Sequence, residues 1–232
     1  MTKIHVKGTI ISDQMQRIYD WIGIDATSPS KVIGALPSDN SNIEVIINSG
    51  GGDVFAGSEI YTALKEYQGE SVSKIVGIAA SAASVIAMGT DKILISPTAQ
   101  MMIHNVSTYG DGDYRDFEHT AEVLRSANQS IANAYKTKTG KNDEELKSLM
   151  DNETWFNADS AIEQGFADEV MFADKKEFAL SASFGGVSLN DDAIEKIASL
   201  MDESKENQQN DQKDTALLAE LNFRLLQLKG IN

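Results

Sequence analysis

The chain has 232 residues, of which 41% are hydrophobic and 24% charged, a balance typical of a soluble globular protein with one sizeable domain. Its 35 acidic residues outnumber its 20 basic ones, and the formal net charge of −15 argues against binding to nucleic-acid phosphates. The absence of cysteine excludes a disulfide framework, cysteine-based zinc sites and a thiol nucleophile.

Short strands alternate with helices along the first half of the chain. Apolar and β-branched residues predict strands at 3–9, 43–48, 74–80, 92–97 and 101–104. Between the first two strands, residues 25–42 carry two prolines and predict a loop. The spacing of Ile60, Leu64 and Tyr67 predicts a helix, and the small apolar residues of 80–89 predict a buried one. This alternation is typical of a parallel α/β core.

Longer helices are predicted in the second half. After a turn-rich loop, an apolar stripe predicts a helix over roughly 114–137 that needs a partner for that face. Asn142 followed by Glu145 has the pattern of a capping box and predicts the start of a shorter helix. Asn157 is expected to cap another helix.

The C-terminal region changes in composition. Residues 176–202 predict a short helical extension, and residues 203–215, which contain no apolar side chain, predict a linker. Over 216–232 an amphipathic helix is predicted from the three, four, three spacing of Leu218, Leu221, Leu225 and Leu228. That helix would dock on a partner or on the protein's own core.

The N-terminus and the hydropathy predict where the protein resides. MTKIHVKG has neither a basic region nor an apolar stretch, so no secretory signal is expected. No run reaches the roughly 18 apolar residues of a membrane span. These features predict a soluble protein that stays in the compartment where it is made.

Ser81 is the candidate nucleophile. It lies between a predicted strand and the apolar helix that follows, so its hydroxyl would lie near a helix N-terminus. Backbone N–H groups at such a position can bind the oxyanion that forms during acyl transfer. Alternatively, Ser81 simply caps the helix. Ser84, one turn later, is more consistent with buried packing.

Among the three histidines, His104 best fits a general base. It ends a predicted strand at the edge of a parallel sheet where α/β active sites collect, although a structural role is the alternative. His5 on the first strand and His119 on a charged helix face predict structural or solvated roles. A third group should orient the imidazole, and the candidates are Asp151 and Glu153.

The glycine run at 50–52 directly follows a predicted strand. Glycine lets the backbone approach a ligand closely and present its N–H groups. Neither GK[ST] nor GxGxxG accompanies the run, so a P-loop or a dinucleotide site is disfavoured. A tight turn is the remaining alternative.

Four segments, in this order, resemble the proteolytic subunit of the Clp protease, especially its phage- and prophage-encoded relatives. INSGGGDVFAGSEIYTAL at 47–64 resembles the family's glycine motif with its first long helix, and GIAASAASVIAMG at 77–89 resembles its nucleophile segment. MMIHNV at 101–106 resembles the histidine segment, and ETWFNADSAIEQGFADEV at 153–170 resembles the closing segment. The resemblance covers about residues 3–172.

The resemblance implies both a fold and a mechanism. Residues 1–175 would form an α/β spiral of β-β-α units with a long protruding helix, an architecture shared with crotonases, followed by a helical C-terminal tail. Ser81 takes the position of the family's catalytic serine, and His104 that of its histidine. Glu153 falls where the family usually has Asp, and Asp151 is the alternative third member of the triad.

Backbone groups complete the site that the resemblance implies. The N–H groups of Gly52 and Ala82 match the positions that form the family's oxyanion hole. Gly50 and Gly51 would lie beside an extended substrate that pairs as an added strand. The implied mechanism needs no metal, nucleotide or other cofactor.

The chain also departs from the family's housekeeping members. Its first strand begins at residue 3, which leaves almost nothing for the N-terminal extension that contacts a ring-shaped ATPase in those members. The loop at 25–42 is atypical, and residues 173–232 lie outside the resemblance. A short N-terminus and an added tail resemble the phage relatives that mature capsids.

These features predict an ATP-independent serine endopeptidase that cleaves phage capsid or scaffold precursors during head maturation. The expected partners are those substrates and further copies in a ring-shaped homo-oligomer, with no nucleic acid, membrane or ATPase partner. The expected location is the cytoplasm, of the host cell if the protein is phage- or prophage-encoded. A crotonase-like acyl-CoA enzyme and a non-catalytic capsid assembly protein are the two alternatives.

Overall fold

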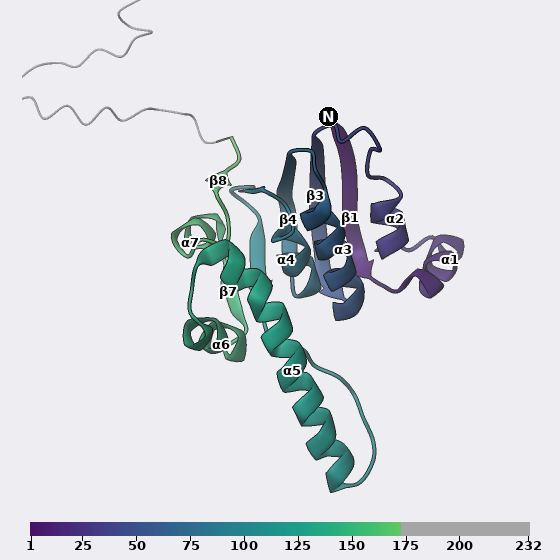
Figure 1. Ribbon diagram of the computed structural model, residues 1–232, viewed down its shortest axis with the longest axis vertical. Coiled ribbons are helices and arrows are strands. Elements are labelled where there is room, and N and C mark those ends of the chain that lie inside the picture. Colours follow the sequence, from purple (N-terminus) through teal and green to yellow (C-terminus); the bar gives the residue numbers. More distant parts are fainter. Residues whose placement is uncertain (173–232) are drawn as a thin grey trace, which may run out of the picture. The chain divides into compact units, whose positions relative to one another are not determined.

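A computed structural model describes residues 1–172 of the chain (Figure 1). The helical extension predicted at 176–202, the linker at 203–215 and the amphipathic helix at 216–232 lie outside the described residues. The proposed domain boundary at residue 175 therefore stays a prediction.

The described residues form an eight-stranded sheet in which only one pair of strands is antiparallel. Its strands are β1 (Thr2–Ile10), β2 (Ala26–Thr27), β3 (Ile43–Gly52), β4 (Ser71–Ala80), β5 (Lys92–Ile95), β6 (Gln100–Ile103), β7 (Thr154–Phe156) and β8 (Glu169–Val170). The main path runs β2-β1-β3-β4-β5-β8. β4 pairs first with β5 and then, nearer its carboxyl end, with β6, which pairs antiparallel with β7. The predicted α/β class with a mostly parallel sheet is confirmed.

The helices follow the patterns of capping and apolar spacing. They are α1 (Asp13–Ile22), α2 (Pro29–Ile33), α3 (Val54–Glu66), α4 (Ala82–Ala87), α5 (Tyr114–Thr139), α6 (Asp143–Asp151) and α7 (Ala158–Glu163). The capping box of Asn142 and Glu145 is present at the start of α6, and Asn157 accepts a hydrogen bond from the Ser160 N–H at the start of α7. No helix in this part of the chain is both long and apolar enough to cross a membrane.

The loop predicted at 25–42 is wrong in part, because that segment contains β2 and α2. Pro29 occupies the first turn of α2, where its missing N–H costs nothing and its fixed φ favours the helix. β2 adds to the sheet by pairing parallel with the end of β1. β3 also extends further than predicted, because the glycine run pairs with β1 as far as Gly52.

Helix α4 is completely buried, as its small apolar residues predict. All six of its residues are buried, and it packs on α3 and on β3 and β4 of the sheet. A helix so tightly enclosed gives the residue that precedes it, Ser81, a rigid support.

Among the described residues, the buried side chains of helix α5 lie near its C-terminal end. Ile131 and Tyr135 are buried there, whereas Phe117 and Val123 are 53% and 50% exposed. Figure 1 shows this helix projecting beyond the sheet, with the connection from β6 running alongside it. The predicted long helix is therefore present, and its apolar stripe is covered at the C-terminal end, by burial of Ile131 and Tyr135, but exposed at Phe117.

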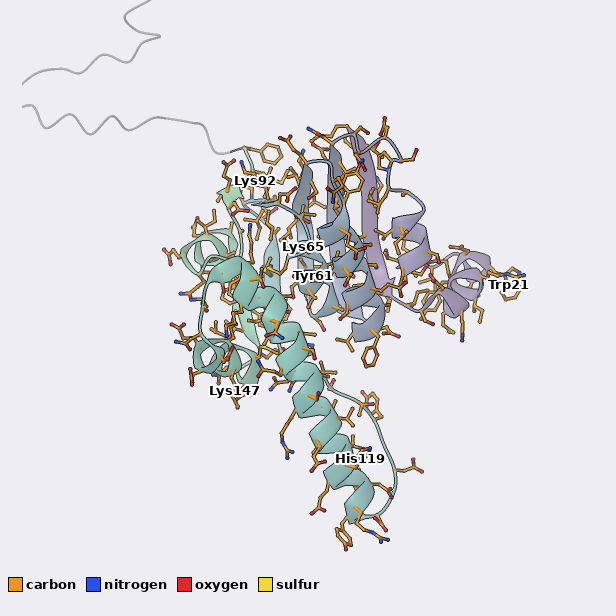
Figure 2. The ribbon with its side chains drawn as sticks, viewed as in Figure 1. Trp21, Tyr61, Lys65, Lys92, His119 and Lys147 are labelled. Atoms are coloured by element: carbon orange, nitrogen blue, oxygen red, sulfur yellow. The ribbon has the colours of Figure 1, made fainter. Side chains whose placement is uncertain are left out.

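Helix α1 is mostly exposed, and only Gln16 and Tyr19 are half-buried among its residues. None of its residues is buried, and Trp21 is 86% exposed and points away from the protein (Figure 2). Ile18 and Ile22 lie on the same helix, and both are also exposed. This apolar surface has no covering among residues 1–172.

Candidate active site

The structure brings Ser81 and His104 together. Ser81 follows β4 and His104 follows β6, and these strands are parallel neighbours, so their carboxyl ends meet at one edge of the sheet. Ser81 Oγ lies 2.8 Å from His104 Nε2, within hydrogen-bond distance. A serine hydroxyl so close to an imidazole nitrogen can transfer its proton as it attacks an electrophile.

Ser81 has an unusual backbone. Its φ of 54° lies in the left-handed region, which a residue with a Cβ rarely adopts. Its side chain makes no capping hydrogen bond to α4, so the alternative that Ser81 serves as a side-chain cap is not what the structure shows. The backbone is held by hydrogen bonds from the Ser81 N–H to the Met102 carbonyl at 2.9 Å and from the Ser84 N–H to the Ser81 carbonyl at 2.9 Å. A strained backbone that is firmly held is common at functional sites.

The end of β3 passes directly beside the serine. A Cβ at Gly51 would lie 2.7 Å from the Ser81 Cβ and 2.8 Å from the Ala80 carbonyl oxygen, and the φ of Gly51 is +97°. Only glycine fits this position, because a side chain would push the two strands apart. Gly51 is itself buried, and Gly50 and Gly52 are exposed.

A cavity of about 750 Å³ opens at this edge of the sheet. Gly52 and Ala82, the two residues predicted to supply oxyanion-binding N–H groups, line it together with Ser81 and His104. Ala82 is the first residue of α4, where a helix leaves its N–H groups without acceptors of its own. Ser81, His104 and an N–H group without a helical acceptor therefore share one space.

Helix α5 forms the far wall of the cavity. Leu124 and Ile131 supply apolar lining, and His119 lines the cavity from the part of α5 that projects beyond the sheet (Figure 2). A structural or solvated role was predicted for His119, and its side chain is exposed. Its position beside the cavity depends on how α5 docks, and no local sequence pattern indicates that docking. His5 is exposed on β1, outside this lining.

Neither predicted carboxylate contacts the imidazole within residues 1–172. Asp151 accepts a hydrogen bond from Asn105 Nδ2 at 2.8 Å and forms an ion pair with Lys147, and the hydrogen bond from Lys147 lowers the pKa of the Asp151 carboxyl. Glu153 has a φ of 45°, and its Oε1 lies 3.4 Å from the indole nitrogen of Trp155. The hydrogen bonds of both carboxylates within these residues therefore go to groups other than His104.

Two hydrogen bonds hold the segment that follows His104. Asn105 donates to Asp151 on α6, and the Val106 N–H donates to Asn128 Oδ1 on α5 at 2.7 Å. These contacts join residues far apart in the sequence, so no motif indicates them. Within the described residues, no group of three or more His, Asp or Glu side chains could hold a metal ion.

The sequence is similar to known proteins over most of the described residues. The model of the Clp protease family matches residues 25–174. The chain is 27% identical over 173 residues to the ATP-dependent Clp protease proteolytic subunit 2 of Tropheryma whipplei, covering 71% of this chain and 96% of that protein. It is 30% identical over 143 residues to proteolytic subunit 1 of Chlamydia muridarum, covering 60% and 74%. The proteolytic subunit of Bacteroides fragilis is 28% identical over 179 residues, covering 74% and 80%.

Proposed function

Because the chain belongs to the Clp protease family, we propose that it is a serine endopeptidase in which Ser81 is the nucleophile and His104 the general base. The observation that carries this proposal is the 2.8 Å distance between Ser81 Oγ and His104 Nε2. The names of the similar proteins, all proteolytic subunits, support a peptidase.

The proposed mechanism is acyl transfer in two steps. Ser81 Oγ attacks the peptide carbonyl carbon while His104 Nε2 takes the hydroxyl proton. The N–H groups of Gly52 and Ala82 donate to the oxyanion that forms. His104 then gives its proton to the leaving amine as the C–N bond breaks. In the second step, a water molecule that gives its proton to His104 attacks the acyl carbonyl, and the proton returns to Ser81 Oγ as the ester bond breaks.

An extended substrate would pair with the backbone at the glycine run. Gly50 is exposed, and no atom outside its chain neighbours lies within 4 Å of where its Cβ would be, so a peptide can approach it. The Gly51 N–H already donates to Ser49 Oγ at 3.1 Å. Gly50 is therefore expected to make the main contacts of the added strand.

Labelling with a fluorophosphonate tests the proposed nucleophile directly. The wild-type protein should form a covalent adduct at Ser81, located by mass spectrometry of the digested protein, and the Ser81→Ala variant should form none. A crotonase-like enzyme, which needs no activated serine, would not be labelled. A non-catalytic assembly protein would also remain unlabelled, so an unreacted wild type contradicts the peptidase proposal.

We expect Glu153→Gln to slow cleavage more than Asp151→Asn. The Asp151 carboxylate is already bound by Lys147 and Asn105. Among residues 1–172 the Glu153 carboxylate makes only the long contact to Trp155, and Glu153 has a strained backbone of the kind found at functional sites. The two variants are compared side by side for kcat on one fluorogenic peptide. If Asp151→Asn has the larger effect, the third member of the triad is Asp151, two positions before the residue proposed here.

The finer proposal is that the substrates are capsid or scaffold precursors and that cleavage needs no ATPase. It is supported by the sequence resemblance and by the C-terminal region, which continues beyond the family match at residue 174. The similar proteins are named ATP-dependent, so independence from an ATPase and the host-cytoplasmic location stay predictions. Incubating wild type and Ser81→Ala with candidate capsid proteins, with and without a Clp ATPase and ATP, tests both parts by mass spectrometry.

We also predict a ring-shaped homo-oligomer. Half-exposed Phe117 and Val123 on α5 and the uncovered face of α1 would be buried between copies. Native mass spectrometry should show a defined multimer at micromolar concentration, and Phe117→Glu with Val123→Glu should weaken it. Glu118→Gln, a neighbouring exposed change, is the control. A wild type that is only monomeric would contradict the prediction.

The C-terminal region is expected to be dispensable for peptide hydrolysis. Ser81, His104 and the cavity all lie within residues 1–172. A chain that ends at Asp202 should hydrolyse a short fluorogenic peptide at close to the full-length rate while losing action on, or association with, the assembling capsid. The same truncation carrying Ser81→Ala gives the background rate. Loss of peptide hydrolysis on truncation would make the tail part of the enzyme's own structure.

A further inference from the structure

Ser84 and Tyr135 form a buried polar contact that the proposed mechanism does not use. Both residues are fully buried, at 0% exposure, and they lie on α4 and near the C-terminal end of α5. Their hydroxyl oxygens lie 2.8 Å apart. Ser84 Oγ also lies 2.6 Å from the Ser81 carbonyl oxygen, to which it donates. The contact thus ends on the backbone of the proposed nucleophile.

The direction of the hydrogen bonds follows from the donors available. A carbonyl oxygen can only accept, so the single hydroxyl proton of Ser84 goes to the Ser81 carbonyl. The Tyr135 hydroxyl must then donate to Ser84 Oγ. Burial raises the pKa of Tyr135, which keeps this hydroxyl protonated at neutral pH. The result is a chain of two hydrogen bonds that points from Tyr135 to the Ser81 carbonyl.

The Ser81 carbonyl is where such support has most effect. The φ of 54° at Ser81 is unfavourable for a residue with a Cβ, so contacts must hold the backbone in place. Besides Ser84 Oγ, the carbonyl accepts the N–H groups of Ser84 at 2.9 Å and Val85 at 3.3 Å. The hydroxyl makes the shortest of these three contacts and is the only one a side-chain substitution can remove.

We propose that Ser84 and Tyr135 are positioning residues that hold the Ser81 backbone so that its hydroxyl stays in line with His104. This inference rests on the proposed role of Ser81 as the nucleophile. Neither residue touches the reacting atoms, and they act only through the carbonyl of Ser81. Tyr135 also belongs to the helix that lines the cavity, so the same contact fixes α5 relative to the nucleophile.

Loss of the hydrogen-bond chain should therefore lower kcat and leave KM nearly unchanged. A misplacement of about 1 Å of a reacting group can cost about 100-fold in rate, whereas peptide binding at the glycine run and the apolar lining does not involve Ser84 or Tyr135. The rate of fluorophosphonate labelling should fall in the same proportion, because it depends on the same hydroxyl.

A matched pair of substitutions isolates the Ser84 hydroxyl. Ser84→Thr and Ser84→Val add nearly the same volume to a buried site, but only threonine keeps a hydroxyl. We expect kcat of Ser84→Val to be about 10- to 100-fold below that of Ser84→Thr, with equal KM values. An overpacked core should affect both variants alike, because the two side chains have nearly the same volume. Rates are normalised to the amount of folded protein, measured by circular dichroism.

Tyr135→Phe removes the second hydrogen bond with little change of shape. We expect it to lower kcat by about tenfold at unchanged KM. The control is Tyr67→Phe, which removes a tyrosine hydroxyl that donates to the Ser41 carbonyl away from the site, and which should keep the wild-type kcat. Tyr135→Phe should add little to the effect of Ser84→Ala, since both break one chain.

The outcomes separate this inference from the proposed function. Equal kcat for Ser84→Thr and Ser84→Val, or a wild-type kcat for Tyr135→Phe, overturns the positioning role while labelling of Ser81 continues. If Ser84→Val does not fold, Tyr135→Phe decides alone. A wild-type protein that neither cleaves peptides nor is labelled overturns both proposals.

Discussion

Replacing Ser81 by alanine is expected to reduce peptide hydrolysis by about 10⁶-fold and to leave the fold intact, because the nucleophile is lost while the packing is kept. The hydroxyl lies against His104 and makes no hydrogen bond to α4. Its removal deletes one hydrogen bond and should therefore change the free energy of unfolding by about 1 kcal/mol. Initial rates on a fluorogenic peptide measure the first effect, and thermal unfolding measures the second.

Ser107→Ala is the matched control for this change. Ser107 lines the same cavity but is exposed and is not the serine next to His104. This variant should keep the wild-type rate. If Ser81→Ala retains activity within about tenfold of wild type, a different group is the nucleophile, since loss of a true nucleophile costs far more.

His104→Ala should have a comparably large effect, about 10⁶-fold on kcat, because a serine hydroxyl without an adjacent base is a weak nucleophile. The double variant with Ser81→Ala should be no slower than either single variant. The effects of substituting residues that act as one unit do not add, since removing one residue already removes the function of the other. Single-turnover acylation rates of the three variants would check this.

His119→Ala is the control for the base. His119 lines the same cavity from α5, and it is the other histidine near the site among residues 1–172. Its loss should leave the acylation rate close to that of the wild type. A larger loss in His119→Ala than in His104→Ala would mean that the base is assigned to the wrong histidine.

The elements that were predicted well depend on short-range interactions. The helix starts at Asn142 and Asn157 are formed by side chains that bond to N–H groups three residues later, so the local sequence contains all the required groups. The buried helix after Ser81 follows from its composition alone. Helix α1 was not predicted, although its apolar residues have helical spacing, and the segment 25–42 was read as a loop because of its prolines.

The sequence indicated which residues form the candidate site but not how they are arranged. The order of motifs indicated Ser81 and His104, and the parallel pairing of β4 and β6 then brought them to 2.8 Å. The resemblance placed Glu153 where the family usually has Asp, with Asp151 as the alternative, but neither carboxylate is hydrogen-bonded to the imidazole within the described residues. Which carboxylate can reach the imidazole depends on side-chain orientation in the turn after α6. Glu153 has a positive φ in that turn, which no local sequence pattern predicts.

The sequence by itself determined the α/β class and the helix caps at Asn142 and Asn157, and it indicated Ser81 and His104 as the candidate nucleophile and base. Each of these depends on local spacing or on a motif that is contiguous in the chain. Tertiary structure alone decided the left-handed backbone of Ser81, the contact between Ser84 and Tyr135, and the place of His119 beside the cavity. These features depend on strand register and on how α5 docks against α4. Both are set by the packing of side chains that are distant in sequence, and no local pattern specifies that packing.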